Sequence, residues 1–353
     1  MTKTENGRPR LRIGQIGAGN FGAYRRGVLR ETGLFDLIAA YDTNPAALAS
    51  AREEDGAAAC GSLEELLGFE GLEGVVISTG AKFHSAQMVA ALERQLPLFV
   101  EKPLCSTPEE LEAILGAAER AGLPIGLGHN DHAAMPGSRY IRDAILSGEV
   151  GQVVAVEATT CHSGGFHIKP GDWRGDPAKN PGGFLFQCGV HKLHELMFYL
   201  GPIARVTAKL RYDINPGTAT ADAAVCLLEF ESGVLGTLNA YHVTPYRHTV
   251  NLFGTLTNYY ASEHAPDGFS LVRQRAAPNY SGAVEPLERM DLPAQWDRTS
   301  GVRSWYQAIR TGSSPSPSLE DGARAVAVVF AAEDSARLGK TVEVPKIRSA
   351  LLV

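Results

Sequence analysis

The 353-residue chain has few cysteines, and none of them is paired in the sequence. The five cysteines are widely scattered and form no CxxC motif: Cys60, Cys105, Cys161, Cys188 and Cys226. This spacing argues against a disulfide framework and against a cysteine-based zinc site. Scattered cysteines of this kind are typical of reduced thiols, so we expect a cytoplasmic protein.

Long hydrophobic runs and a strong excess of one charge are also missing. No apolar run approaches the roughly 20 residues that a membrane helix needs. The first ten residues, MTKTENGRPR, lack the apolar core of a signal peptide. The net charge of −6 gives no general attraction to nucleic acids or anionic membranes. We therefore expect neither kind of partner, and the length favours two globular domains.

A glycine-rich motif near the start of the chain follows a strand-like segment. Residues 12–22 read RIGQIGAGNFG, and a helix-compatible segment follows from Asn20 and Phe21 onward. Gly17 permits a tight turn, Gly19 lets the backbone approach a diphosphate, and Gly22 lets helix and strand pack closely. The diphosphate would lie at the helix N-terminus, where N–H groups favour negative charge. The motif predicts a dinucleotide-binding fold.

An acidic residue indicates which dinucleotide is bound. Asp42 ends a second strand-like run, 20 residues beyond Gly22. A carboxylate there accepts hydrogen bonds from the adenosine ribose 2′-hydroxyl and repels a 2′-phosphate. Thr43 and Asn44 follow, so no arginine is at hand to bind a phosphate. NAD is favoured over NADP, and the alternative is that Asp42 is only a solvated turn residue.

The first third of the chain alternates between strand-like and helix-like segments. The pattern predicts strands over 11–16, 36–41, 74–78, 97–100 and 124–128, and helices over 20–32, 45–55, 83–94 and 108–121. The last of these helices has Thr107 as its N-cap and Pro108 at its first position. Such alternation is typical of βαβ units, so residues 1–128 are predicted to form an α/β Rossmann domain with a doubly wound parallel sheet.

A different pattern begins after Gly128. We expect helices over 136–147, 187–200 and 318–339, and a strand over 152–160. Alternating runs between 203 and 253, with a turn at 231–233, indicate antiparallel strands, whereas 261–293 reads as polar and loop-rich. Residues 129–353 are therefore predicted to form an α+β domain with a mostly antiparallel open sheet, which binds substrate and mediates oligomerisation.

Two motifs connect the chain to a known family. Glu101-Lys102-Pro103 follows the predicted strand over 97–100, and PGGFLFQCGVHKLHEL occupies residues 181–196. Together with IAAYDTNPA at 38–46 and the segment 318–344, these motifs resemble the Gfo/Idh/MocA oxidoreductases, which include sugar and inositol dehydrogenases. The resemblance extends from about residue 12 to residue 344. It implies an NAD(P)-dependent dehydrogenase that acts on CH–OH groups.

The resemblance also implies roles for individual residues. Lys102 would hydrogen-bond the substrate oxygen and stabilise negative charge on it, and His191 would be the general base. Two positions depart from the family pattern, because its aspartates four residues before and three residues after that histidine are here Gln187 and His194. Gln187 can bind a sugar hydroxyl but cannot balance the charge of Lys102, so Lys102 itself could become a partial base.

Other residues complete the predicted site. Within the loop at 161–183, Trp173 offers a flat face for a sugar ring and Arg174 offers donors, although Trp173 could equally just pack the loop down. The candidate substrate contacts are Gln187, Trp173, Arg174, Asn130, His167 and His194. The candidate cofactor contacts are Gly17, Gly19, Asn20, Phe21, Gly22, Asp42, Thr79, His84, Glu101 and Lys102.

The histidines around the second motif also suggest a metal site. His191 and His194 can share a helical face, and His162 and His167 could join them. Catalytic zinc needs three convergent protein ligands and an open position. Because the family resemblance already accounts for His191, we predict no metal.

The resulting hypothesis is an NAD-dependent oxidoreductase. It would transfer a hydride between nicotinamide and a secondary alcohol of a sugar, cyclitol or sugar derivative. One alternative is NAD-assisted cleavage of a glycoside or C–X bond by transient oxidation and elimination. Another is a non-catalytic, cofactor-bound sensor. By analogy, an open sheet with an uncovered face predicts a homodimer or homotetramer.

Overall fold

The computed structural model describes residues 9–264, 268–277, 284–293 and 297–347. The chain forms two compact units, each discontinuous in sequence. The described part of the first unit comprises residues up to 131 and 297–323, and that of the second comprises 132–293, with the gaps just given, and 324–347. The domain boundary between residues 128 and 129 stays a prediction.

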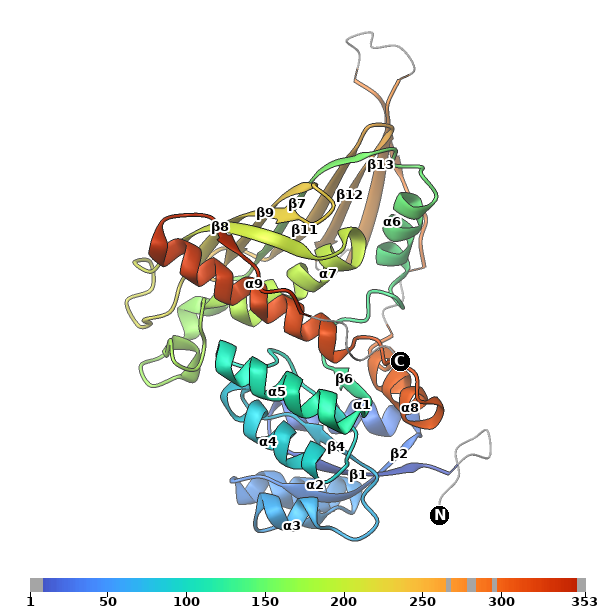
Figure 1. Cartoon of the computed structure of the whole chain (residues 1–353), viewed down its shortest axis with the longest axis vertical. Helices are drawn as coiled ribbons and strands as arrows, with labels where there is room; N and C mark the ends of the chain where they lie inside the picture. The colour runs from blue at the N-terminus through green and yellow to red at the C-terminus, as the bar shows by residue number, and fades with distance from the viewer. Residues whose placement is uncertain (1–8, 265–267, 278–283, 294–296, 348–353) are drawn as a thin grey trace. The chain divides into compact units, whose positions relative to one another are not determined.

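The first unit contains a parallel sheet of six strands in the order β3-β2-β1-β4-β5-β6 (Figure 1). The order reverses direction between β1 and β4, as in doubly wound folds, so the predicted Rossmann architecture is confirmed. The strand bounds are β1 (Leu11–Ile16), β2 (Phe35–Tyr41), β3 (Ala58–Ala59), β4 (Gly74–Ile77), β5 (Leu98–Val100) and β6 (Ile125–Leu127).

Six helices belong entirely to this unit in its described part: α1 (Phe21–Thr32), α2 (Pro45–Asp55), α3 (Leu63–Leu67), α4 (Ala81–Glu93), α5 (Pro108–Ala121) and α8 (Ser300–Thr311). The predicted start of α5 is confirmed. The Thr107 hydroxyl accepts a hydrogen bond from Glu110 N at 3.2 Å, and the Glu110 carboxylate accepts one from Ser106 N at 2.7 Å. This reciprocal arrangement satisfies two donors that a helix start otherwise leaves unpaired.

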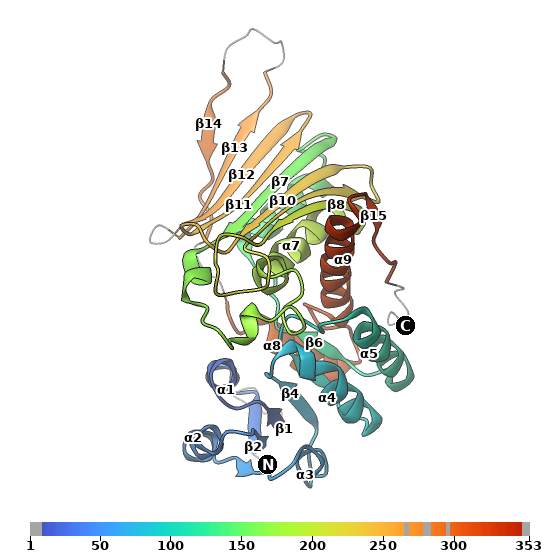
Figure 2. The same ribbon diagram turned by 90° about the vertical axis from the view of Figure 1, so that its left-hand side faces the viewer.

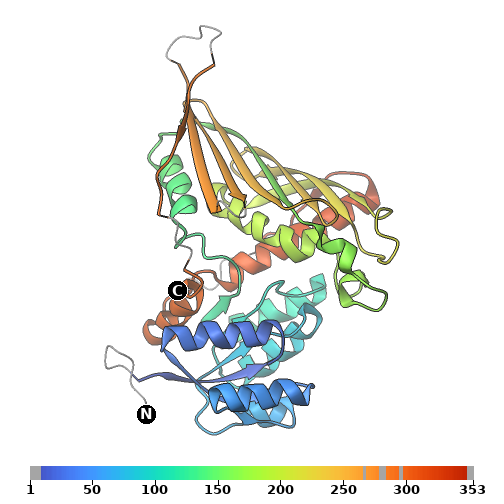
Figure 3. The ribbon, with the colours of Figure 1, turned by 180° about the vertical axis from the view of Figure 1, so that it is seen from behind.

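One face of the parallel sheet is covered by α1 and α8, while α4 and α5 lie on the other (Figures 2 and 3). Trp305 of α8 is fully buried, and its ring centroid lies 5.5 Å from that of Phe35 and 5.9 Å from that of Phe99. The sequence analysis did not predict α8. The helical spacing of Val302, Trp305 and Tyr306, all buried, was the available signal.

The second unit contains a nine-stranded sheet in the order β14-β13-β12-β11-β7-β10-β9-β8-β15 (Figure 2). All pairs are antiparallel except β7 with β10, which confirms the predicted mostly antiparallel sheet. The bounds are β7 (Val153–Cys161), β8 (Ile203–Arg211), β9 (Ala223–Phe230), β10 (Leu235–Tyr241), β11 (Arg247–Gly254), β12 (Thr257–His264), β13 (Gly268–Arg275), β14 (Leu287–Arg289) and β15 (Val342–Glu343).

In the described residues of this unit, the helices pack against one face of the sheet (Figures 1 and 3). They are α6 (Pro136–Leu146), α7 (Val190–Leu200) and the part of α9 (Leu319–Leu338) that belongs to this unit. Along β9, buried residues such as Cys226 and Leu228 alternate with the exposed Val225 and Leu227, so the opposite face is open. Among the described helices, none combines the length and apolar character of a membrane span.

Two predictions for this unit were wrong in detail. Residues 261–293, expected to be loop-rich, contain the end of β12 and all of β13 and β14, while 265–267 and 278–283 lie outside the described residues. The strands form because Ala261 pairs with Leu271 and both are buried. The helix expected over 187–200 begins instead with a π-helical turn at Leu185–Gly189 that continues into α7.

Candidate active site

The residues predicted for the site are divided between the two units, and each group is described within its own unit. The first unit holds the glycine-rich loop, Asp42, Thr79, His84, Glu101, Lys102 and Asn130. The second holds His167, Trp173, Arg174, Gln187, His191 and His194. All the loops of the first group follow the carboxyl ends of parallel strands, which is where doubly wound sheets bind ligands.

The three glycines of the loop between β1 and α1 differ in what surrounds them. Gly17 has a φ of +84°, and a Cβ there would lie 2.9 Å from backbone atoms of Ser78. A Cβ at Gly22 would lie 2.1 Å from the carbonyl oxygen of Gly17. At Gly19 the nearest atom would be Ala47 Cβ, at 3.3 Å. The protein's own packing therefore requires glycine at 17 and 22, whereas the absence of a side chain at 19 suits the approach of a ligand.

Asp42 holds this loop in place. Its Oδ2 accepts hydrogen bonds from Ala18 N at 2.7 Å and Gly19 N at 3.2 Å, and its Oδ1 accepts one from Asn44 N at 2.8 Å. Asp42 is thus not simply a solvated turn residue. A carboxylate offers about four lone pairs, so capacity for a ribose hydroxyl remains.

The start of α1 is left open on its N-terminal side. Asn20 precedes the helix with a φ of +43°, and its side chain forms no cap hydrogen bond. Phe21 is 48% exposed, and the centroid of its ring lies 5.1 Å from that of Tyr24. Helix N-termini without a side-chain cap present N–H groups that suit an anion such as a diphosphate.

Glu101 connects the predicted catalytic lysine to α1. Its Oε1 accepts a 2.6 Å hydrogen bond from Arg25 Nε, and the two side chains are 4% and 8% exposed. The Arg25 guanidinium also lies 4.8 Å from the centroid of the Phe99 ring in β5. Lys102 is the next residue, half-buried and joined to Pro103 by a cis peptide bond. Arg25 belongs to no recognisable motif, so it could not be predicted from the sequence.

His84 links the two loops that follow β4 and β5. It is fully buried, with Nε2 3.0 Å from the carbonyl oxygen of Thr79 and Nδ1 3.2 Å from that of Leu104. Burial lowers the pKa of His84, although the carbonyl contacts oppose this shift. The Thr79 hydroxyl donates to Gln87 Oε1 at 2.6 Å. Asn130 lies half-buried beyond β6.

In the second unit, the predicted base lies on α7. His191 is half-buried in the first turn of α7, directly after the π-helical segment that contains the half-buried Gln187. Gly182, at the start of this motif, donates its N–H to Glu333 Oε1 of α9 at 2.5 Å. A π-helical turn places one extra residue in the helix and is frequent at functional sites. The motif is therefore anchored at its start and irregular next to His191.

A buried charged cluster, which the sequence analysis missed, lies on α7 beyond His191. Lys192 Nζ donates to Glu195 at 2.6 Å and to Glu263 at 3.2 Å, and the Tyr199 hydroxyl donates to Glu195 at 2.8 Å. Burial alone would raise the pKa of Glu195, but the charge and hydrogen bond of Lys192 outweigh it and the pKa is lowered. The i, i+3 spacing of lysine and glutamate was the only signal in the sequence.

His194, predicted as a substrate contact, is only 5% exposed. Its ring centroid lies 5.1 Å from that of His132. Burial lowers the pKa of His132 to about 3, so His132 is neutral near physiological pH. The structure therefore places His194 in the protein interior of this unit, against a second imidazole.

The loop at 161–183 presents side chains from an anchored backbone. The carbonyl of Arg174 accepts hydrogen bonds from Asn180 Nδ2 at 2.6 Å and from the Thr220 hydroxyl at 2.8 Å. The Arg174 guanidinium pairs with Asp172 at 3.0 Å and lies 5.1 Å from the ring of Trp173, which is 39% exposed. Trp173 and Arg174 thus remain accessible within this unit.

The suggested metal ligands do not gather into one group. His167 is exposed at the end of a 3₁₀ turn (Ser163–His167). His162 Nδ1 accepts a hydrogen bond from Gly164 N at 2.9 Å, and its Nε2 lies 3.9 Å from Cys188 Sγ. In the part of the chain that the structure describes, no three histidine, cysteine, aspartate or glutamate residues are arranged to hold a metal ion.

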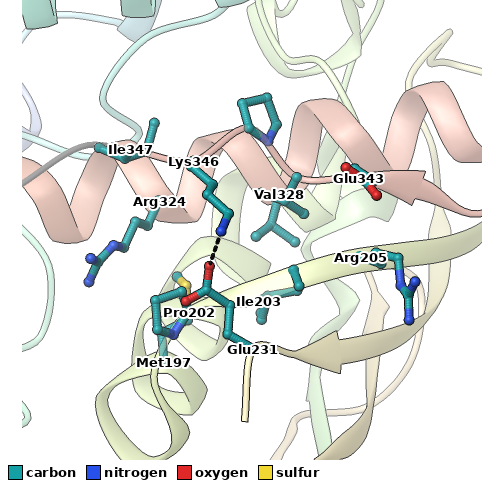
Figure 4. Close-up of a pocket in the computed structure, with 13 residues that line it drawn as sticks. Met197, Pro202, Ile203, Arg205, Glu231, Arg324, Val328, Glu343, Lys346 and Ile347 are labelled. Atoms are coloured by element: carbon teal, nitrogen blue, oxygen red, sulfur yellow. Dashed lines mark ion pairs between the residues drawn. The ribbon is translucent and has the colours of Figure 1, made fainter. Parts of the chain in front are cut away.

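A cavity of about 990 Å³ in the second unit lies away from these residues (Figure 4). It is bordered by Met197 at the end of α7, Ile203 of β8 and Val328 of α9. Lys346 and Glu231 form an ion pair at 3.6 Å on its wall, as Figure 4 shows. None of the predicted site residues lines this cavity.

Comparison with known proteins adds independent information. Residues 11–129 match the model of the oxidoreductase family, NAD-binding Rossmann fold, and residues 138–259 match that of the GFO/IDH/MocA C-terminal domain. The chain is 26% identical over 289 residues to 1,5-anhydro-D-fructose reductase of Ensifer adhaerens, covering 80% of this chain and 83% of that protein. It is 27% identical over 303 residues to D-apiose dehydrogenase of Paraburkholderia graminis, covering 80% and 76%.

A solved structure has the same fold. The structure of levoglucosan dehydrogenase in complex with NADH matches with a TM-score of 0.85 and 19% identity. The match covers 96% of this chain and 100% of that one.

Proposed function

The chain belongs to the GFO/IDH/MocA family of oxidoreductases, and from this premise we propose that it is an NAD-dependent dehydrogenase of a sugar, cyclitol or sugar derivative. One observation carries the proposal. The glycine-rich loop, Asp42, Thr79 and Lys102 all follow carboxyl ends of parallel strands in one sheet, whose order reverses between β1 and β4. This edge is where such sheets bind dinucleotides.

The residues of the first unit fit NAD. Gly19 has no side chain to obstruct a diphosphate, and α1 begins without a side-chain cap. Asp42 retains acceptor capacity for the ribose 2′-hydroxyl, and its negative charge disfavours the 2′-phosphate of NADP. Once bound, NAD supplies the acceptor for the hydride that leaves the substrate carbon.

The remaining chemistry belongs to two side chains. Lys102 donates a hydrogen bond to the substrate oxygen and stabilises the negative charge that develops there. His191 accepts the hydroxyl proton, because an imidazole titrates near neutral pH. With bound NAD as the hydride acceptor, the secondary alcohol would become a ketone, and its hydroxyl proton would pass to His191. Gln187, four residues before this base in the motif, hydrogen-bonds a neighbouring substrate hydroxyl.

Sugar-like substrates are favoured by the loop at 161–183. Trp173 offers an exposed aromatic face and Arg174 an exposed guanidinium on an anchored backbone. Aromatic faces and charged donors of this kind bind sugar rings and their hydroxyls. The names of the two relatives, a reductase of an anhydrosugar and a dehydrogenase of a pentose, support the same class.

The test is to mix the protein and NAD with a panel of sugars, inositols and glycosides. NADH fluorescence and substrate consumption are followed in parallel. We expect NADH in equal amount to the substrate consumed. Consumption without net NADH would instead indicate redox-assisted cleavage, and cofactor binding without any consumption would indicate a sensor.

Variants at the two proposed catalytic residues sharpen this test. Lys102→Met and His191→Asn should each lower kcat by about 100-fold or more. The Kd for NADH should stay close to that of the wild type in His191→Asn, because that residue acts on the substrate hydroxyl. Wild-type turnover in either variant would contradict its assigned role.

We also propose that the protein is a cytoplasmic homodimer or homotetramer. The open face of the nine-stranded sheet exposes Val225, Leu227 and Leu235, which are 48%, 44% and 52% exposed. A second copy of the chain would cover these side chains. None of the five cysteines, all of which lie in the described residues, forms a disulfide, which supports a reducing compartment.

A further inference from the structure

Two side chains form hydrogen bonds to the backbone of a single residue, Ala18, in the loop between β1 and α1. The N–H of Ala18 donates to Asp42 Oδ2 at 2.7 Å, and the carbonyl oxygen of Ala18 accepts a hydrogen bond from Arg26 Nη1. The two peptide groups that flank Ala18 are therefore both fixed. Gly19 and Asn20, whose backbone leads into α1, follow directly.

Arg26 is a fully buried charge, with 0% of its side chain exposed. Besides Ala18, its guanidinium donates to Asp55 Oδ2 at 2.7 Å and to the Ser50 hydroxyl at 2.8 Å, both in α2. Each of its three nitrogens thus has its own acceptor. A planar, forked guanidinium can serve three acceptors in fixed directions, and a lysine ammonium cannot.

We infer that Arg26 is a positioning residue for the cofactor. Because its side chain is fully buried, Arg26 would act through the loop and not by touching the cofactor. By binding the Ala18 carbonyl it fixes the loop in the conformation that leads into the start of α1, where the diphosphate would lie, and through Ser50 and Asp55 it ties that loop to α2. Burying a guanidinium is costly, and Asp55 offsets this cost. The inference rests on the proposed function, because it assumes that the loop binds a dinucleotide.

Arg30 provides a matched control on the same helix. It pairs with Asp55 through Oδ1 and, at 3.2 Å, with Glu54 Oε2, which also lies 3.4 Å from Arg26 Nη2. Its side chain is 45% exposed, and its hydrogen bonds are made to α2 and not to the loop. In Arg26→Met, Arg30 still neutralises Asp55, so the substitution leaves no buried carboxylate without a counter-charge.

The experiment compares Arg26→Met with Arg30→Met. The Kd values of NADH and of ADP-ribose are measured by fluorescence and calorimetry. We expect Arg26→Met to raise both by about 10- to 100-fold, as for loss of a charge-assisted hydrogen bond. It should leave kcat at saturating NAD within about twofold of the wild type. Arg30→Met should leave both Kd values unchanged.

Hydrogen exchange of a peptide covering residues 14–22 supplies a readout that needs no cofactor. The loop amides should exchange faster in Arg26→Met and at the wild-type rate in Arg30→Met. If Arg26→Met does not fold, Arg26→Lys replaces it, with the same expected loss of affinity because the fork is gone.

Two outcomes separate this inference from the proposed function. Equal Kd values in the wild type and in a folded Arg26 variant, or a fall in thermal stability alone, would overturn the role of Arg26 and leave the cofactor assignment intact. A wild-type protein that binds neither NADH nor ADP-ribose would overturn the cofactor assignment itself, and this inference with it.

Discussion

Arg25 and Glu101 form an almost fully buried ion pair next to Lys102. Glu101→Gln removes the anion and leaves the guanidinium buried. Because an uncompensated buried charge is strongly destabilising, we expect a loss of about 3–5 kcal/mol in the free energy of unfolding. Denaturant-induced unfolding of the wild type and the variant measures this difference. Glu229→Gln is the matched control.

The control breaks an ion pair with Arg205, which is 53% exposed. An exposed pair of this kind contributes at most about 1 kcal/mol. Similar losses in the two variants would show that the Arg25–Glu101 pair is not effectively buried. A parallel measurement of kcat in Glu101→Gln shows whether activity falls with stability, since Glu101 precedes the proposed catalytic lysine in the chain.

His242 is a residue-scale source of acid sensitivity. Burial, with the nearby His162 and Arg174, lowers the pKa of His242 to about 4, below the value of about 6.5 expected for an unfolded histidine. Between these values the unfolded state binds more protons than the folded state. The contribution of the neutral His242 to the free energy of unfolding is therefore complete above pH 6.5, and it is lost as the pH falls towards 4.

The substitution His242→Phe tests this dependence and preserves the ring, which stacks on Phe184 at 4.5 Å. Between pH 6.5 and 4, we expect the free energy of unfolding of the variant to decline by about 1–2 kcal/mol less than that of the wild type. Urea unfolding at a series of pH values measures both slopes. His167→Phe, at an exposed position, should keep the wild-type slope. If His242→Phe also keeps the wild-type slope, His242 is not a source of the acid sensitivity.

At the scale of single elements, α5 depends on its N-terminal cap. Thr107→Ala removes the hydroxyl that accepts from Glu110 N. Loss of such a cap costs about 1 kcal/mol of unfolding free energy, whereas Thr107→Ser keeps the hydroxyl and should cost a few tenths. Chemical denaturation of both variants distinguishes the cap from mere loss of side-chain volume, which would make the two equally destabilised.

Elements with a clear local signal could be predicted from the sequence. The bounds of β1, α2 and α5 agree with the predicted ranges, because strand alternation, helix caps and glycine stops are encoded within each segment. The predictions failed for α8, β13 and β14, whose residues are polar on one side. Strand β13 forms by pairing with β12, and β14 forms by pairing with β13. No local sequence pattern reveals these pairings.

The candidate site was predictable to the extent that it consists of contiguous motifs. Gly17, Asp42 and Lys102 follow strand ends as their motifs require. Their supporting contacts were not predictable, because Arg25 binds a residue 76 positions away and Arg26 one 29 positions away. Such pairs depend on the tertiary fold, and a single sequence does not display them.

At the scale of the whole molecule, the open face of the nine-stranded sheet leads to a prediction of assembly. Leu227 pairs across β9 and β10 with Thr237, and Leu235 pairs with Glu229, so both leucines lie on the same face. Light scattering should give a mass of two or four chains for the wild type, which is 37.7 kDa as a single chain. The double substitution Leu227→Lys, Leu235→Lys should give monomers, because lysine disfavours burial at an interface.

Leu146→Lys is the control for this prediction. Leu146 is 73% exposed but lies at the end of α6, away from the open face. This variant should keep the wild-type mass. A wild-type protein that elutes as a monomer, or a double variant that stays assembled, would show that the open face is not the interface.

The position of Asp42 has a consequence for redesign of cofactor preference. The usual way to admit NADP is to remove the acidic residue that repels its 2′-phosphate. Here the same carboxylate binds the amides of Ala18 and Gly19, so its removal would also release the loop proposed to receive the diphosphate. A change of cofactor in this protein therefore needs a neutral residue that still accepts hydrogen bonds, such as asparagine or serine, together with a new cation nearby. One side chain therefore serves both the electrostatic preference and the loop, and any substitution at 42 must preserve the hydrogen bonds while it removes the charge.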